Sequence, residues 1–365
     1  MRILISGNSG YVGPCVTRQL RLTWPNARLI GVDAGYFEDR AAEASDTEQD
    51  RQVDADIRDL SGSIFNQVDA VVHLAALSND SMAKAFENAA DEVNYVATVD
   101  VAKKAKKAGV KSFVFASTYR VYGASACGAS SEDVARTEAS PVNGGTAYSR
   151  SKLAAEAALR SLAGREFTVT CLRFANACGM SPALRLDTVL NNYVASAVLS
   201  GEIRVMSNPA AWLKLIHVRD MARAIDWAVA RPGANGGSHL VLNAGSDAWT
   251  MRAGELANAV ADAIPGVTLC FPREGAPETG SWRVDFGLFR RLAPLHQPRE
   301  KLAPSVVELK TALEGILARH GKDPSRLNRL KVLSWMVEQG RLDKDLRWAR
   351  GAEAAAAERC AISVI

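Results

Sequence analysis

The sequence predicts an α/β fold, with a doubly wound parallel sheet and a smaller, discontinuous α/β lobe. Strand-like apolar runs alternate with helix-like segments through the first half of the 365-residue chain. This alternation is typical of βαβ units with right-handed crossovers. A glycine-rich turn follows the first run, and an acidic residue ends the second. Beyond residue 180 the pattern changes, and the smaller lobe is expected there.

The expected strands are short apolar runs, as in the buried strands of a parallel sheet. They lie at residues 2–6, 28–32, 69–74, 112–117 and 167–173, and a further short strand should end near Asp54. Helices are expected at 13–23, 88–108 and 146–163.

Three units are expected along the chain. The large domain should comprise residues 1–180 plus 214–245, because Leu215–Val218 and His239–Asn243 look like returns of the chain to it. The smaller lobe should comprise 181–213 plus 246–305. Residues 306–365 form a charged tail with a helical pattern, in which the alanine-rich 351–359 could be helical or frayed.

The first strand runs into Gly7, Gly10 and Gly13, spaced as Gly-x-x-Gly-x-x-Gly around Tyr11 and Val12. Glycine permits a tight turn and lets the backbone approach a pyrophosphate, and the N-terminus of the next helix favours an anion. Asp33 lies 20 residues after Gly13, where an acid binds an adenosine ribose and repels a 2′-phosphate. No arginine follows directly, so NAD is favoured over NADP.

Tyr148 precedes Lys152 by four residues on an expected helix. Side chains at this spacing share a face, and an ammonium there favours the phenolate, which suits proton transfer near neutrality. The pair alone could equally be two surface side chains. However, it follows Ser117 and Thr118, which end a strand-like run.

Composition narrows the class of protein. The net charge is +4, and we find no basic block interleaved with aromatic residues, so nucleic acid is not an expected partner. No signal peptide and no 18-residue apolar span is recognised, which predicts a cytoplasmic protein without a membrane partner. The six cysteines lack C-x-x-C spacing and the five histidines are scattered, so reduced thiols and no metal site are expected.

These motifs, with His73-Leu-Ala-Ala76, resemble the extended short-chain dehydrogenase/reductase family. Within it, the chain is similar to the NAD-dependent nucleotide-sugar epimerase/dehydratase branch, from residue 1 to about 300. Three further segments carry the resemblance: Phe115–Gly123, Leu172–Asn176 and Ile216–Asp220. The fold it implies is a Rossmann sheet with a substrate lobe.

The resemblance implies a catalytic set of Thr118, Tyr148 and Lys152. Thr118 would bind a sugar oxygen, Tyr148 would be the base, and Lys152 would bind the nicotinamide ribose and keep Tyr148 acidic. The implied cofactor-binding residues are Gly7, Gly10, Tyr11, Val12, Gly13, Asp33, Asp56, Ile57, Leu74, Ala75, Ala76, Asn94, Ser117, Tyr148 and Lys152. The implied substrate-binding residues are Ser78, Asn79, Thr118, Tyr119, Asn176, Lys214 and Arg283.

Several of these residues have structural alternatives. Thr118 could serve simply as a backbone cap at the strand end. Asn94 could be a helix residue with local hydrogen bonds alone, and the acidic loop with Asp56 could be solvated. We interpret His217 as structural and Cys178 as a buried, inert thiol.

The chain departs from the family pattern in two places. Tyr119 and Arg120 stand where the 4,6-dehydratases carry an Asp-Glu pair, and arginine is not a useful acid at neutral pH, which argues against dehydration. Leu213 replaces a nucleotide-binding arginine. Lys214 could supply that charge and Trp212 could stack on a base, and Arg185, Arg273 and Arg283 are either phosphate partners or surface charges.

The resemblance therefore implies an NAD-dependent nucleotide-sugar epimerase acting at C4 through a transient keto-sugar. The close alternative is an NAD(P)-dependent keto-sugar reductase or dehydrogenase, and a third is a non-catalytic cofactor-sensing protein. The family also implies a homodimer formed through the helices near 88–108 and 149–163.

Overall fold

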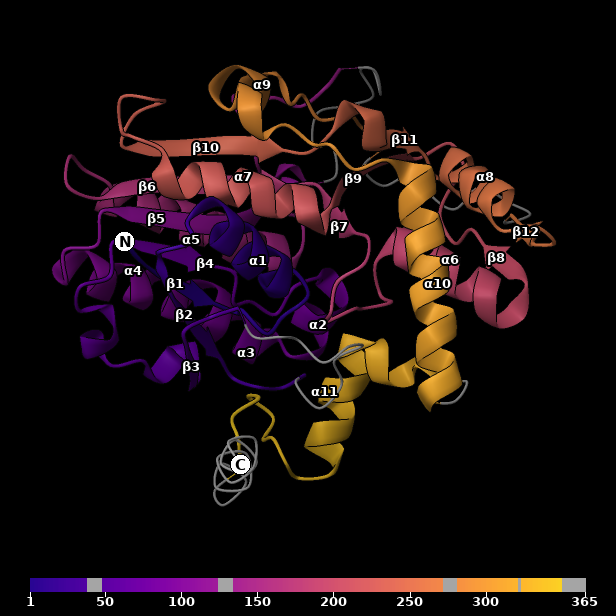
Figure 1. The fold of residues 1–365 in the computed structure, drawn as a ribbon, viewed down its shortest axis with the longest axis horizontal. Coiled ribbons are helices and arrows are strands. Elements are labelled where there is room, and N and C mark those ends of the chain that lie inside the picture. The colour runs from indigo at the N-terminus through magenta and orange to yellow at the C-terminus, as the bar shows by residue number, and fades with distance from the viewer. Residues whose placement is uncertain (38–47, 124–133, 272–280, 321–322, 350–365) are drawn as a thin grey trace.

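The computed structural model describes residues 1–37, 48–123, 134–271, 281–320 and 323–349. Within these residues, seven strands form one parallel sheet (Figure 1). Their spatial order is β10 (His239–Ala244), β6 (Thr168–Phe174), β5 (Ser112–Thr118), β4 (Ala70–His73), β1 (Arg2–Ser6), β2 (Arg28–Asp33) and β3 (Arg51–Asp54). The strand order reverses between β1 and β4, as in a doubly wound sheet, and the predicted fold class is confirmed.

Helices cover both faces of this sheet (Figure 1). Alternate residues of β1 explain why: Ile3 and Ile5 pack into one core with Val16 of α1, whereas Leu4 packs into the other with Val101 of α4. On the first face lie α1 (Gly13–Thr23) and α7 (Val218–Ala230). On the second lie α4 (Thr98–Lys107) and α5 (Ala147–Leu162).

The helix predicted at 88–108 is not uniform. It consists of α3 (Glu87–Asp91), a π-helical stretch at Glu92–Ala97, and α4, and it is preceded by α2 (Asp80–Ala85). Asn94 lies in the π-helical stretch, with its side chain fully buried. Local π-helical turns recur at functional sites, where they redirect a side chain.

The smaller lobe contains two further sheets among the described residues. One joins β7 (Asn176–Cys178), β9 (Trp212–His217) and β11 (Thr250–Arg252), and the other pairs β8 (Glu202–Arg204) with β12 (Thr268–Cys270). Its helices include α6 (Val189–Ser200) and α8 (Ala253–Ala263), whereas α9 (Gly287–Leu292) packs beside β10 of the main sheet. Of the two predicted returns to the large domain, β10 joins the main sheet, whereas β9 lies in the three-stranded sheet before α7. The predicted domain boundaries stay a prediction.

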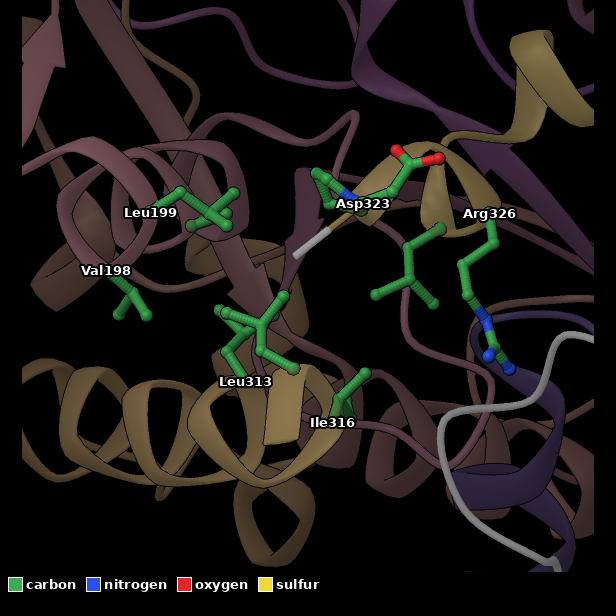
Figure 2. Close-up of a pocket in the computed structure, with 10 residues that line it drawn as sticks. Val198, Leu199, Leu313, Ile316, Asp323 and Arg326 are labelled. Atoms are coloured by element: carbon green, nitrogen blue, oxygen red, sulfur yellow. The ribbon is translucent and has the colours of Figure 1, made fainter. Parts of the chain in front are cut away.

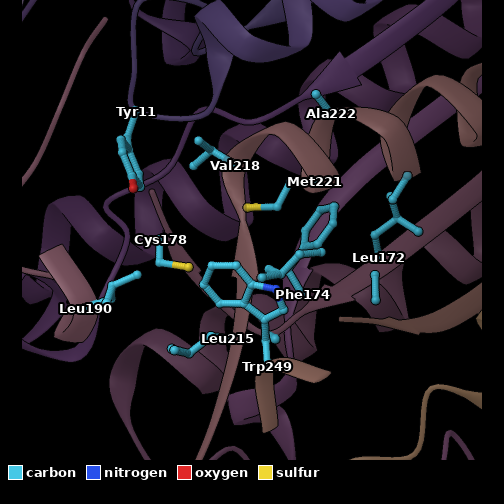
Figure 3. Close-up of a cluster of buried hydrophobic side chains, with 14 of the residues drawn as sticks. Tyr11, Leu172, Phe174, Cys178, Leu190, Leu215, Val218, Met221, Ala222 and Trp249 are labelled. Carbon is cyan, nitrogen blue, oxygen red and sulfur yellow. The ribbon is translucent and has the colours of Figure 1, made fainter. Parts of the chain in front are cut away.

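A continuous apolar core joins the lobe to the main sheet. Figure 3 shows Trp249 beside Cys178, Leu215 and Phe174, which come from three different strands. Cys178 is fully buried, and burial raises the pKa of its thiol well above the usual range, as expected for an inert cysteine.

Two long helices end the described chain. Helix α10 (Leu302–His320) packs on α6 and α8, and α11 (Arg329–Glu338) packs on α2 (Figure 1). The alanine-rich segment 351–359, which could be helical or frayed, lies outside the described residues. Within the described chain, no helix has the length and apolar character needed to cross a membrane.

Candidate active site

A cleft of about 680 Å³ opens at the carboxyl ends of the main-sheet strands. This is where open α/β sheets bind ligands. Most of the predicted site residues line it together: Gly7, Gly10, Tyr11, Val12, Asp33, Asp56, Ile57, Leu74, Ala75, Ala76, Ser78, Asn79, Ser117, Thr118, Tyr148, Lys152 and Asn176.

The glycine-rich turn leaves room for a dinucleotide. Gly7 has φ +79°, and a Cβ there would lie 2.6 Å from the backbone nitrogen of Ala75. At Gly13 a Cβ would lie 2.1 Å from the carbonyl oxygen of Asn8, so this glycine lets α1 pack against the turn, although it does not line the cleft. No side chain among the described residues caps the N-terminus of α1. Its N–H groups and dipole therefore suit a diphosphate.

Asp33 ends β2 at the cleft wall, where an adenosine ribose is expected. Its carboxylate accepts hydrogen bonds from the backbone N–H groups of Ser9 (3.2 Å) and Gly35 (3.0 Å). Burial nevertheless raises the pKa of Asp33. Asp56 is not in a solvated loop, because Arg58 pairs with it at 2.5 Å. The residues present thus fit NAD.

The predicted catalytic residues come from two elements. Thr118 ends β5, and its hydroxyl oxygen accepts a hydrogen bond from the backbone N–H of Arg120 at 3.2 Å. Tyr148 and Lys152 lie one turn apart on α5. All three line the cleft.

The predicted role of Lys152 in keeping Tyr148 acidic stays a prediction. Burial raises the pKa of Tyr148 to about 12, against the lowering effects of Arg120 and then Arg185. Burial also lowers the pKa of Lys152 to about 7. The amine of Lys152, only 1% exposed, donates to the carbonyl oxygen of Ala116 at 2.9 Å and lies over the ring of Phe115. Burial therefore governs the pKa of both groups, which lie one turn apart on the same helix.

A buried polar network fixes the floor of this site. Glu156 accepts hydrogen bonds from Ser117 (2.5 Å) and from Arg173, whose Nη2 lies 2.7 Å away. Arg173 also donates to the hydroxyl of Tyr122 at 3.1 Å. Because every charge here is paired, the network can hold β5 and α5 in register. The Ser117 hydroxyl is therefore committed to Glu156 rather than directed at the cofactor.

The other end of the cleft is rich in arginine. Arg120 lines it and pairs with Asp80 at 2.9 Å. Arg185 donates to the hydroxyl of Ser78 at 2.7 Å and pairs with Asp187 at 2.5 Å. Both cations stand where a substrate's anionic or hydroxyl groups can reach them.

Other predicted residues do not line the cleft. Tyr119 is buried and accepts a hydrogen bond from Asn176 at 3.0 Å. The Lys214 amine is buried between the rings of Tyr119 and Trp282 and donates to two backbone carbonyls. Arg283 is exposed and, with Arg252, lies over Trp212, so that ring is already stacked. Arg273 lies outside the described residues.

Asn94 and His217 are both structural. Asn94 accepts a hydrogen bond from the Leu77 backbone N–H (2.9 Å) and donates to the Leu77 carbonyl and the Ser151 hydroxyl. It therefore positions the strand-end loop rather than touching the cleft. His217 caps α7 by accepting from the backbone N–H of Arg219 at 3.1 Å. Its structural interpretation is confirmed.

Sequence reasoning missed several residues that line the cleft. At the expected adenosine end they are Tyr36, Phe37, Arg329 and Leu346, and on the lobe side Tyr193, Arg204, Met206 and Ser207. No motif marks them, because they reach the cleft from the loop after β2, from the smaller lobe and from the tail.

A second, much smaller hollow lies away from this cleft. It lies between α6, α10 and the turn at 323–327, and it has a volume of about 10 Å³, which suits about one water molecule (Figure 2). No cluster of potential metal ligands occurs among the described residues.

Comparison with known proteins agrees with this site. The model of the NAD dependent epimerase/dehydratase family matches residues 3–245. UDP-glucose 4-epimerase of Bacillus subtilis (strain 168) is 28% identical over 276 residues, which cover 70% of this chain and 78% of the relative. A dTDP-glucose 4,6-dehydratase of Mycobacterium tuberculosis is 29% identical over 171 residues, which cover 44% of this chain and 48% of the relative.

Solved structures show the same fold. A UDP-glucose-4-epimerase from Stenotrophomonas maltophila, with bound NAD and formylated UDP-arabinopyranose, has a TM-score of 0.72 at 22% identity, covering 87% of this chain and 99% of that chain. A UDP-glucuronic acid 4-epimerase from Bacillus cereus has a TM-score of 0.72 at 16% identity, covering 87% and 100%. With its glycine turn, Asp33 and the Tyr148–Lys152 pair in one cleft, the chain belongs to the NAD dependent epimerase/dehydratase family, and it is an enzyme of the extended short-chain dehydrogenase/reductase type.

Proposed function

We propose that this protein is an NAD-dependent nucleotide-sugar 4-epimerase. The observation that carries the proposal is that Tyr148 and Thr118 line the cleft together with Arg120, which is paired with Asp80, a carboxylate outside the cleft lining. The carboxylates that line the described cleft are Asp33, Asp56 and Asp187, of which the last two are paired with arginines. This arrangement supports redox at one carbinol and leaves no acid pair for eliminating water.

The proposed chemistry divides between cofactor and protein. NAD, when bound, accepts a hydride from the sugar carbon and returns it. Thr118 holds the sugar oxygen by hydrogen bonding, and Tyr148 takes the hydroxyl proton at its Oη and later gives it back. Arg120 and Arg185 favour the phenolate that this exchange needs. Turning the keto-sugar before the hydride returns inverts the carbon.

The test is incubation of the pure protein with UDP- and dTDP-hexoses, followed by separation of the products. We expect interconversion of two epimers without added cofactor. Stoichiometric consumption of NAD(P)H would instead identify a keto-sugar reductase or dehydrogenase, and loss of water from the sugar a dehydratase. Either result would overturn the proposal.

The base is tested separately with Tyr148→Phe. General acid–base catalysis contributes roughly 10²- to 10⁴-fold, so kcat should fall by about that factor while the protein stays folded. Tyr95→Phe is a matched control, because Tyr95 lies in the π-helical stretch and does not line the cleft. Unchanged turnover in Tyr148→Phe would remove Tyr148 from the chemistry.

A further inference from the structure

The end of the described chain folds into a tight turn against the cofactor end of the cleft. Residues 342–348 form a hairpin in which Leu342 bridges to Trp348 and the backbone N–H of Asp343 donates to the carbonyl oxygen of Arg347. The Asp343 carboxylate accepts hydrogen bonds from the backbone N–H groups of Asp345 and Arg347, both at 2.9 Å. We call residues 342–348 the C-terminal clasp.

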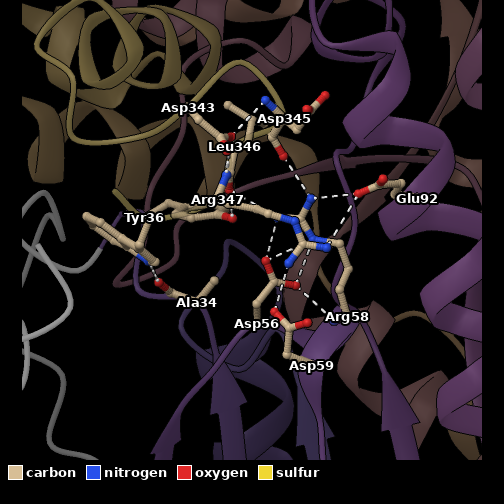
Figure 4. Close-up of polar contacts among 11 residues, drawn as sticks. Ala34, Tyr36, Asp56, Arg58, Asp59, Glu92, Asp343, Asp345, Leu346 and Arg347 are labelled. Carbon is tan, nitrogen blue, oxygen red and sulfur yellow. Dashed lines mark hydrogen bonds and ion pairs between the residues drawn. The ribbon is translucent and has the colours of Figure 1, made fainter. Parts of the chain in front are cut away.

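Polar contacts hold the clasp to the loops that follow β2 and β3 (Figure 4). Arg58 donates to the carbonyl oxygens of Asp345 (2.7 Å) and Leu346 (3.1 Å). Trp348 donates from its indole nitrogen to the Ala34 carbonyl at 2.8 Å, and Arg347 pairs with Asp59 at 2.9 Å. The loops so held carry Asp33, Asp56 and Ile57, the residues expected around adenosine.

Apolar burial adds to these contacts. Leu346 is 1% exposed, and it packs with Leu342 and α11 in a small core that also contains Met82 and Leu77. Tyr36, which lines the cleft, packs against this core and donates its hydroxyl to the Leu346 carbonyl. Leu346 itself lines the cleft, so the clasp forms part of its wall.

Arg329, the first residue of α11, brings a positive charge to the same wall. Its side chain is only 5% exposed, yet it lines the cleft. The guanidinium lies 3.9 Å from the Phe37 ring centroid and donates to the Ala183 carbonyl at 2.8 Å, but no carboxylate among the described residues pairs with it. A buried cation without an anionic partner is costly unless a ligand supplies the charge.

The surroundings of Arg329 indicate which ligand. Burial lowers its pKa to about 9, and Arg185, Asp187, Asp33 and Tyr11 all act on it electrostatically. Asp33 marks the expected ribose and Tyr11 belongs to the glycine turn. Arg329 therefore stands beside the path of the dinucleotide's diphosphate.

We propose that Arg329 binds the diphosphate of the dinucleotide and that the C-terminal clasp closes the adenosine end of its site. The tail then retains the cofactor between turnovers. The proposed epimerase needs this, because its cofactor is unchanged at the end of each cycle. The proposal concerns cofactor binding, so its test does not depend on which sugar reacts.

The experiment measures the rate at which NAD leaves the full-length protein, with a dehydrogenase that consumes each released molecule. Arg329→Gln should release NAD roughly 10- to 100-fold faster, and Arg329→Lys should recover part of that loss. The double variant Arg347→Gln/Trp348→Phe alters only clasp anchors outside the cleft, and it should release NAD roughly 10-fold faster. Arg165→Gln, at an exposed turn, is the control and should match the parent.

Release rates equal to the parent in both the Arg329→Gln and the double variant would overturn the proposal. If only the apparent affinity for nucleotide sugar fell in Arg329→Gln, the arginine would serve the substrate diphosphate instead. Hydrogen exchange on the parent protein gives a result that needs no variant. NAD should slow exchange at the amides of residues 343–348, and no slowing there would also contradict the clasp.

Discussion

At the residue scale, the spacing along the sequence predicted which side chains share the cleft but not their electrostatics. Tyr148 and Lys152 do line one cleft, as the four-residue interval predicts. Their pKa values, however, follow from how much water the fold removes around them, and burial dominates both. The lowering influence on Tyr148 comes first from Arg120, a residue that the sequence marked only as a departure from the dehydratase pattern.

Arg120 should set the pH dependence of catalysis. Removing its charge in Arg120→Gln removes stabilisation of the Tyr148 phenolate, so the pKa of Tyr148 should rise and the rate profile should move to higher pH. We expect kcat at neutral pH to fall about tenfold, with partial recovery in Arg120→Lys. Arg150→Gln is the control, because Arg150 lies on α5 with Tyr148 but is exposed to solvent. Equal profiles for all variants would refute the electrostatic role.

His73 should make the protein sensitive to acid. It is fully buried between Ser6 and Thr98, and burial lowers its pKa to about 3. The unfolded chain binds a proton near pH 6.5, whereas the folded chain does not until about pH 3, so stability falls as pH drops through this window. Measured by urea, the free energy of unfolding should fall between these pH values by on the order of a few kcal/mol more in the parent than in His73→Gln. A parallel loss in both proteins would contradict this assignment.

At the element scale, the turns were more predictable than the helices. The glycine spacing predicted the strand–turn–helix unit at the cleft, because only glycine meets its backbone demands. The helix predicted at 88–108 was right in extent, but its π-helical stretch, which turns Asn94 toward the Leu77 backbone, has no sequence signature. Likewise the sequence left open that Trp212 could stack on a base, and it did not predict that two arginines from other segments lie over the ring.

The glycine turn gives a direct test at this scale. Gly7→Ala places a Cβ 2.6 Å from the Ala75 backbone at a φ of +79°, so it should destabilise the protein by about 2 kcal/mol or more and weaken NAD binding. Gly62→Ala is the control, since a Cβ there meets nothing within 4 Å. Its effect should stay within about 1 kcal/mol. Denaturant unfolding measures the stability and calorimetric titration the NAD affinity. An equal response of the two variants would contradict the role given to Gly7 in the glycine turn.

At the scale of the whole molecule, the tail is what the sequence could not explain. Its charged helical pattern was recognised, but the contacts of Arg58 and Tyr36 with the clasp are made to backbone carbonyls 287 and 310 residues away. Every residue carries a backbone carbonyl, so the sequence does not show which carbonyl accepts such a hydrogen bond. The homodimer formed through α4 and α5 likewise stays a prediction, since one chain does not test it.

The central claim is that one sugar carbon loses a hydride and regains the same one, while Tyr148 exchanges only the hydroxyl proton. The most direct measurement is to run the conversion of a nucleotide hexose in D₂O and locate deuterium in the product. The account predicts an epimer with no deuterium on the reacting carbon and no loss of water. Deuterium bound to that carbon, or a dehydrated product, would contradict it.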